Sequence, residues 1–203
     1  MNELKIAWLA PWNVQSAVAR SARVVAGELE RRGHQVAVFR TEVGAALDLP
    51  ALPAPSGGVH FLAHASPDEM RGSFDVTVAQ IGDHLGFHGA LLDKLAQLDV
   101  VGVFHDAFLG NLIYCWLDGD ERALRDLTIQ TYGLHAWTND ESYLIDVTDM
   151  MKRRPMLECV ARSTVAAVAH AEHYAGRLRA ASKGPVEIIP LAFSCDEMPP
   201  VPS

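Results

Sequence analysis

Residues 5–40 read KIAWLAPWNVQSAVARSARVVAGELERRGHQVAVFR, and this stretch decides the fold class of the 203-residue chain. It begins and ends with short apolar runs, KIAWLA and QVAVFR, that are typical of buried strands. Between them Ser16 is suited to cap a helix. One face of that helix is apolar and carries Val18, Ala22, Val25 and Leu29. Gly33 suits a left-handed helix end, so the stretch predicts a right-handed βαβ unit.

The same alternation of apolar runs and helical segments continues along the chain. Further strands are expected at 59–63, 75–81, 100–104, 164–169 and 185–189, and helices at 86–98 and 171–181. Pro155 suits the first turn of another helix that runs to about Arg162. A proline-rich surface loop is expected at 49–58, and residues 107–158 are expected to contain no strand.

These elements predict an α/β protein with a Rossmann-like, doubly wound and mainly parallel sheet that has helices on both faces. Residues 1–193 are expected to form a single domain. Residues 194–203 contain three prolines and are expected to be a linker or tail.

Composition excludes some classes of function. The chain has 17 basic and 25 acidic residues, for a formal net charge of −8, which argues against nucleic-acid binding. The same charge weakens, without excluding, an electrostatic grip on an anionic membrane. Cys115, Cys159 and Cys195 are odd in number and widely spaced, which indicates neither a disulfide framework nor a cysteine zinc site. With no recognisable signal peptide, a cytoplasmic location is expected.

Ligands of doubly wound sheets bind beyond the carboxyl ends of the strands, where the strand order reverses. The candidate site therefore consists of residues that follow the predicted strands. They are Asn13 and Ser16 after the first strand, Gly82, His84 and His88 after the fourth, His105 and Asp106 after the fifth, and His170 after the sixth. Four of the nine histidines fall in these positions, more than scatter alone would give.

Each candidate also has a structural interpretation. A histidine that closes a strand can simply bond a neighbouring carbonyl, and for His84, His88 and His170 both interpretations stay open. For His105-Asp106 the pattern favours function, because a buried carboxylate beside an imidazole orients its tautomer and stabilises its charged form. Gly82 could admit a ligand close to the backbone or merely form a turn.

The first loop lacks GxGxxG, so a dinucleotide fingerprint is absent. Its helix N-terminus could still bind phosphate with help from Asn13 and Ser16, or these residues could serve only the helix cap. Asp118-Gly119-Asp120 spells the DxD pattern of metal-dependent sugar transferases, but it follows no strand and is interpreted as a solvated turn. Cys115 lies among apolar residues and is interpreted as core rather than as a nucleophile.

Several stretches together resemble the GT4-like glycosyltransferases of the GT-B fold, over residues 5–193. They are IAWLAPWNVQSAVAR, ELERRGHQVAVF, DVTVAQIGDHLGFHGALL, VVGVFHDAFL, RPMLECVARSTVAAVAHAEHYAGRL and PVEIIPLAF. The most specific signal is the strand that ends in His105-Asp106, combined with the later strand that ends in His170 and then IIPLAF. The turn ERRGHQV is shared by many Rossmann domains.

The resemblance implies that the chain is the N-terminal, acceptor-binding half of a retaining, metal-independent enzyme that uses a nucleotide-sugar donor. It places His105 at the reacting sugar, the loop around Ser16-Ala17 beside the donor phosphates, and His88 near the acceptor. His105 and Asp106 are the expected catalytic residues. No cofactor and no metal are implied. Bacterial polysaccharide or glycoconjugate assembly is the expected pathway class, and peripheral membrane contact and homo-oligomerisation stay open.

Two departures from the family bear on this expectation. Ala17 stands where a glycine is common, and the chain ends where the family crosses into its donor-binding domain, so little turnover is expected from these residues alone. A non-catalytic interaction or dimerisation module, with residues 109–117 as an interface, is one alternative. A self-sufficient nucleotide-binding enzyme is another, and the missing glycine fingerprint argues against it.

Overall fold

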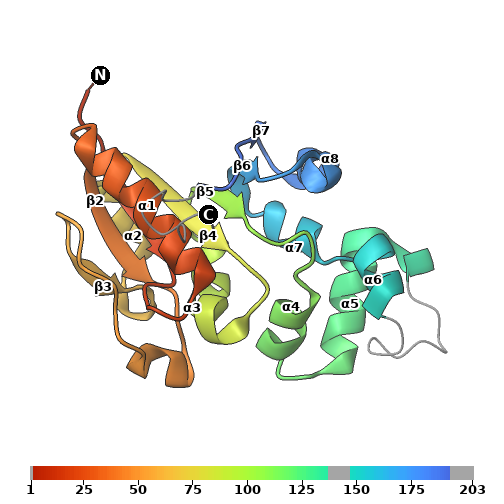
Figure 1. Ribbon diagram of the computed structural model, residues 1–203. Helices are drawn as coiled ribbons and strands as arrows, with labels where there is room; N and C mark the ends of the chain where they lie inside the picture. The colour runs from red at the N-terminus through yellow and green to blue at the C-terminus, as the bar shows by residue number, and fades with distance from the viewer. Residues whose placement is uncertain (1, 137–146, 193–203) are drawn as a thin grey trace, which may run out of the picture.

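A single parallel sheet of seven strands, in the order β3-β2-β1-β4-β5-β6-β7, forms the centre of the protein in the computed structural model (Figure 1). The structure describes residues 2–136 and 147–192. The strands are β1 (Lys5–Ala10), β2 (Gln35–Arg40), β3 (Val59–Phe61), β4 (Val76–Ile81), β5 (Val100–Phe104), β6 (Thr164–Ala169) and β7 (Val186–Ile188). All six neighbouring strand pairs are parallel.

The strand order confirms the predicted doubly wound fold. From β1 the chain builds outward through β2 and β3, then crosses back to place β4 on the other side of β1. The order reverses there, so the carboxyl ends of β1 and β4 form the switch point at which such sheets bind ligands. The βαβ unit at residues 5–40 has the predicted strand boundaries, and Gly33 has the expected positive φ of 89°.

Helices cover both faces of the sheet. They are α1 (Ala17–Arg31), α2 (Pro67–Ser73), α3 (Leu85–Leu95), α4 (Gly110–Trp116), α5 (Glu121–Tyr132), α6 (Val147–Arg153), α7 (Leu157–Ala161) and α8 (Glu172–Ala181). Short 3-10 turns lie at Gly44–Asp48, Leu62–His64 and Leu134–Ala136. In Figure 1, α1 lies across β1 and β2, while α4 to α7 gather beside the other half of the sheet.

Two hydrophobic clusters explain why β1 is apolar from Ile6 to Ala10. Ile6 and Trp8 belong to a cluster with α1, whereas Ala7 and Leu9 belong to a larger cluster that contains residues of α3, α7 and α8. Successive side chains of a strand point to opposite faces, so a strand buried on both sides carries apolar residues at every position. The sequence therefore shows a continuous run rather than an alternation.

Two local predictions are wrong. Pro155 does not open a helix, because Met156 adopts a left-handed conformation (φ 60°) and α7 starts after it. Cys115 is exposed rather than core, since α4 turns Leu112 and Ile113 inward and leaves Cys115 on its outer side. The turn at Asp118-Gly119-Asp120 is confirmed: Asp120 caps α5 and accepts hydrogen bonds from Arg122 N and Ala123 N.

The predicted linker at 194–203 lies outside the described residues, as does Cys195. Among the residues that the structure describes, no helix combines the length and the apolar character needed to cross a bilayer.

Candidate functional site

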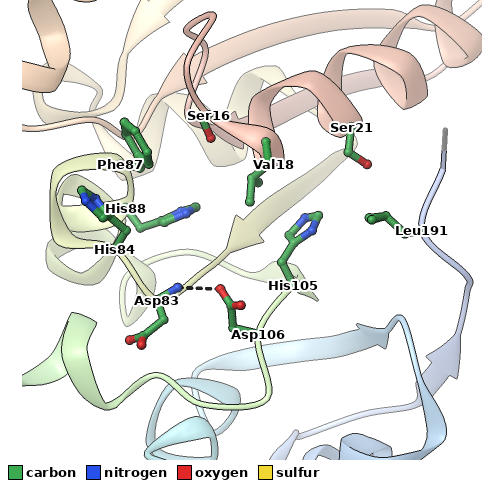
Figure 2. Close-up of a pocket in the computed structure, with 11 residues that line it drawn as sticks. Ser16, Val18, Ser21, Asp83, His84, Phe87, His88, His105, Asp106 and Leu191 are labelled. Atoms are coloured by element: carbon green, nitrogen blue, oxygen red, sulfur yellow. Dashed lines mark hydrogen bonds between the residues drawn. The ribbon is translucent and has the colours of Figure 1, made fainter. Parts of the chain in front are cut away.

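A cavity of about 550 Å³ opens at the switch point of the sheet (Figure 2). Its walls come from residues that follow four different strands: Ser16 and Ala17 after β1, Asp83 and His84 after β4, His105 and Asp106 after β5, and Leu191 after β7. Val18 and Ser21 of α1 and Phe87 and His88 of α3 complete it. Strands separated along the chain deliver these residues to one edge because parallel strands end on the same side.

The β1–α1 loop, residues 11–16, reaches the cavity at Ser16 and leads into the start of α1; it is here termed the loop wall. A buried carboxylate holds it: Glu42 Oε1 accepts hydrogen bonds from Trp12 N (2.8 Å) and Asn13 Nδ2 (3.0 Å). Arg40 Nη2 lies 3.0 Å from the same oxygen, and both side chains of this ion pair are almost fully buried. The network ties the loop to the segment after β2, so its backbone is fixed at the edge of the cavity.

Asn13 is fully engaged inside this loop. Its Oδ1 accepts hydrogen bonds from Gln15 N and Ser16 N, each at 3.0 Å, while its amide donates to Glu42. The side chain is buried and does not line the cavity, so the structure separates Asn13 from the other candidate residues. It shapes the wall from behind.

The N-terminus of α1 faces the cavity. Ser16 caps the helix, since its Oγ accepts a hydrogen bond from Ala19 N at 3.2 Å. Ser16, Ala17 and Val18 all line the cavity. A helix of this length presents free N–H groups and a partial positive charge at its start, which suits an anionic group. The predicted positions Ser16 and Ala17 therefore lie where an anion could meet the helix.

His88 and His105 form the opposite side, here termed the imidazole wall, and Gln80 joins them. His88 is 1% exposed, and its Nδ1 lies 3.1 Å from the main-chain oxygen of Gln80. A carbonyl oxygen can only accept, so Nδ1 carries the proton and Nε2 keeps a lone pair. Burial, reinforced by the neighbouring His105, lowers the pKa of His88 to about 3. The ring is therefore neutral at pH 7.

His105 is also neutral and held by Gln80. Its Nε2 lies 2.7 Å from Gln80 Oε1, and burial together with the nearby His170 lowers the pKa of His105 to about 4. The rings of His105 and His170 are 4.7 Å apart. His170 Nδ1 donates to Ile189 O (2.7 Å), and its Nε2 is buried with no hydrogen-bond partner in the described chain. His170 thus bonds a neighbouring carbonyl and packs behind His105 without lining the cavity.

The expected pairing of His105 with Asp106 is wrong. Asp106 is exposed, and its Oδ2 accepts a hydrogen bond from Asp83 N at 2.8 Å (Figure 2). The group that orients His105 is an amide from the neighbouring strand, and the imidazole is kept neutral rather than charged. Both His105 and Asp106 do line the cavity, so the structure brings the two residues to one place without joining them.

Asp83 is a half-buried carboxyl group at the edge of the cavity. Burial, with a smaller contribution from Asp106, raises the pKa of Asp83 to about 6. Its carboxylate accepts hydrogen bonds from Asn111 Nδ2 and Leu112 N, both at 2.7 Å. The carboxylate therefore anchors the start of α4.

A glycine is required at position 82 because the neighbouring side chains of His88 and Asp106 leave no room for a Cβ, and not because the backbone turns there. A Cβ at this position would lie 2.8 Å from His88 Nε2 and 3.1 Å from Asp106 Oδ2. The absence of a side chain lets the imidazole wall close over the end of β4. His84 is exposed at the rim, where its ring stacks on Phe87 with 4.5 Å between centroids.

The sequence analysis did not single out Gln80, which lies within the apolar strand β4, or Glu42, which follows β2 by two residues. The signal was present: Gln80 is the only strongly polar residue in the run VTVAQI, and a polar side chain at a buried strand position needs a partner. Asp83 lies between the predicted residues Gly82 and His84 and was not itself among the predicted site residues. In the described chain no group of three or more His, Cys, Asp or Glu side chains is arranged to hold a metal ion.

Chemically, the two walls are complementary. The imidazole wall offers lone pairs to hydrogen-bond donors, and pKa values of about 3 and 4 make its rings weak bases at pH 7. The start of α1 offers N–H groups to an acceptor or an anion. The cavity therefore suits a ligand that carries hydroxyl groups on one side and an anionic group on the other. No protein-family model matches this chain, and no curated protein is significantly similar to it in sequence.

Proposed function

We propose that the chain is the acceptor-binding, N-terminal domain of a retaining, metal-independent GT-B glycosyltransferase that uses a nucleotide-sugar donor. The observation that carries the proposal is the switch-point cavity, where two neutral imidazoles, His105 after β5 and His88 on α3, face the start of α1. Sugars present many hydroxyl donors, and neutral imidazole lone pairs accept from them without placing a charge beside the ring.

The loop wall supports the same proposal. Trp12 and Asn13 are buried and the loop is tied to Glu42, so the start of α1 is presented in one fixed position. Binding groups held rigidly before the ligand arrives lose less entropy on association. A phosphate placed at this helix start would lie across the cavity from His105, which is the arrangement that a nucleotide-sugar donor needs.

His105 takes the central role in the proposal. It lines the cavity after β5, has its tautomer set by Gln80, and has His170 behind it. With a pKa of about 4 it would accept a hydrogen bond from a sugar hydroxyl and orient the sugar, rather than remove a proton. Asp106, exposed on the same rim, would accept from a second hydroxyl.

Calorimetric titration of the chain tests the proposal. The panel contains uncharged hexosides, cyclitols and sugar phosphates, together with UDP- and GDP-sugars, each measured with EDTA and with Mg²⁺. Binding rather than turnover is measured, because enzymes of the resembled family hold their donor mainly in a second domain. We expect a sugar-bearing ligand to bind equally well with EDTA and with Mg²⁺.

Two variants locate the binding. His105→Ala should weaken binding at least tenfold, about 1.4 kcal/mol, since it removes the central acceptor. His135→Gln removes an exposed histidine far along the chain from the cavity residues and should bind as wild type does. If no ligand of the panel binds, or if His105→Ala binds with unchanged affinity, the proposal fails. NAD(P) is titrated in the same way, and its binding without binding of any sugar-bearing ligand would instead support the nucleotide-binding alternative.

A further inference from the structure

Gln80 occupies an unusual place, because one residue contacts both imidazoles of the cavity. Its side-chain Oε1 lies 2.7 Å from His105 Nε2, and its main-chain oxygen lies 3.1 Å from His88 Nδ1. The residue is 3% exposed and is the last but one of β4. It does not line the cavity, so it can act on a ligand only through the two rings.

The two contacts select opposite tautomers. At His88 the main-chain carbonyl of Gln80 accepts a hydrogen bond from Nδ1–H, so the proton stays on Nδ1 and the lone pair lies on Nε2. At His105 the side-chain amide oxygen of Gln80 accepts a hydrogen bond from Nε2–H, so the proton stays on Nε2 and the lone pair lies on Nδ1. Within the described part of the chain, neither His88 Nε2 nor His105 Nδ1 makes a hydrogen bond. Both rings point into the cavity (Figure 2).

We infer that Gln80 is a positioning residue that locks His88 and His105 as neutral acceptors with opposite tautomers. The consequence is a selection of ligand groups: hydroxyl and amine groups that donate are favoured at this wall, and carboxylate or phosphate oxygens are disfavoured. The inference concerns the free protein and holds whatever ligand the cavity takes. Gln80 thereby sets the polarity of the imidazole wall.

The surroundings of His105 make such control effective. Around it lie His170 at the end of β6, His88 on α3, and Asp83 and Asp106 at the cavity edge. Asp83 and Asp106 are joined to each other through Asp83 N, and neither carboxylate bonds a ring nitrogen. Gln80 is therefore the side chain that fixes the proton on His105.

Histidine side-chain ¹⁵N NMR of the 203-residue chain at pH 7 tests the inference directly. In the wild type we expect His88 protonated at Nδ1 and His105 at Nε2, with assignments made from His88→Gln and His105→Gln. A proton on His105 Nδ1, or an imidazolium at either residue, would overturn it. This measurement needs no substitution at position 80, so it stands even if a Gln80 variant folds poorly.

Two substitutions separate positioning from a structural role. Gln80→Glu keeps the acceptor and adds a negative charge, so the pKa of His105 should rise by about 1–3 units. Gln80→Met keeps the approximate volume, removes the acceptor, and should abolish the slowly exchanging His105 Nε2–H signal. In both variants His88 should keep its Nδ1 proton, because its acceptor is the main chain.

Gln97→Glu and Gln97→Met are the matched controls, since Gln97 is exposed at the end of α3 and bonds only Asp93 O through its side chain. They should leave both rings unchanged. An unchanged pKa of His105 in Gln80→Glu, or a retained Nε2–H signal in Gln80→Met, would contradict the inference. Because no ligand is added, failure here is distinct from failure of the sugar-binding proposal.

Discussion

The loop wall and the imidazole wall face each other across one cavity, yet they use polar groups in opposite ways. In the loop wall, the side chain of Asn13 forms its hydrogen bonds within the protein, with Glu42 and with the loop backbone. In the imidazole wall, His88 and His105 each use one ring nitrogen and keep the other. Groups that are saturated internally hold a shape, whereas groups with a spare lone pair remain able to bind.

The contrast extends to charge. The loop wall depends on a buried ion pair, Arg40–Glu42, while the imidazole wall stays neutral because burial lowers the pKa values of its rings. A buried charge loses its hydration and needs a partner to remain charged. A buried imidazole has a second solution, which is to release its proton. The two walls should therefore respond differently to mutation and to pH.

Glu42→Ala should produce the largest effect on stability. It leaves Arg40 buried without its partner and removes the acceptor of Trp12 N and Asn13 Nδ2. We expect the free energy of unfolding, measured by urea denaturation, to fall by about 3–5 kcal/mol. Glu172→Ala removes an exposed ion pair with Arg179 and should change it by less than about 1 kcal/mol. Equal effects of the two substitutions would show that the loop wall does not depend on Glu42.

Gly82→Ala should produce an intermediate effect, centred on the other wall. The added methyl would meet His88 Nε2 and Asp106 Oδ2, so the imidazole wall must shift. We expect a loss of about 1–3 kcal/mol in the free energy of unfolding and a change in the ¹⁵N signals of His88.

Gly27→Ala is the control for this substitution. Nothing lies within 4 Å of a Cβ at that position in α1, and the change should stabilise the protein by about 0.5–1 kcal/mol. An unaltered stability of Gly82→Ala, together with unaltered His88 signals, would mean that the wall is looser than its geometry indicates.

Lowering the pH should have a smaller effect than these substitutions. It should reduce the free energy of unfolding gradually, because the buried rings of the imidazole wall resist protonation. Below pH 6.5, the usual pKa of histidine, both imidazoles bind protons in the unfolded chain but stay neutral in the folded protein. Stability is therefore lost as the pH falls toward the folded-state pKa values, about 4 for His105 and about 3 for His88. Asp83 acts in the opposite sense: its raised pKa contributes stability at low pH that is lost as pH rises through about 6. Because two imidazoles oppose one carboxyl group, the net effect of acid on these three groups is a loss of stability.

His88→Gln isolates one of these contributions. Between pH 6 and pH 4 it should make the dependence of the free energy of unfolding on pH shallower by up to about 1.4 kcal/mol per pH unit. Urea denaturation at a series of pH values measures the slope. His135→Gln should keep the wild-type slope. If His88→Gln also keeps it, His88 is not a neutral buried ring in the folded protein.

Much of the fold was predictable because its strands and helices show in local patterns of apolar and polar residues. The strands at 5–10, 35–40, 100–104 and 164–169 have the predicted boundaries. The strand expected at 59–63 ends at Phe61, and the helix expected at 86–98 ends at Leu95. The helix that Pro155 suggested starts later, because Met156 takes a left-handed conformation. Cys115 was misplaced because a short apolar run does not show which side of its helix faces the core.

The candidate site was predictable in position and not in its contacts. A parallel sheet delivers residues after its strands to one edge, and Ser16, His84, His88, His105 and Asp106 do line one cavity. Asn13 and His170 lie behind its walls. Nothing in the sequence near His105 identifies Gln80, 25 positions earlier, as its partner in place of the adjacent Asp106.

The sequence by itself determined the βαβ start, the parallel sheet and the edge at which polar side chains gather, because strand and helix periods are properties of neighbouring residues. Only the tertiary structure decided which of those side chains are engaged and which are free. A hydrogen bond requires two atoms to approach within about 3 Å in the right direction. Whether Gln80 meets His105, or Glu42 meets Trp12, depends on strand register and packing across the whole sheet.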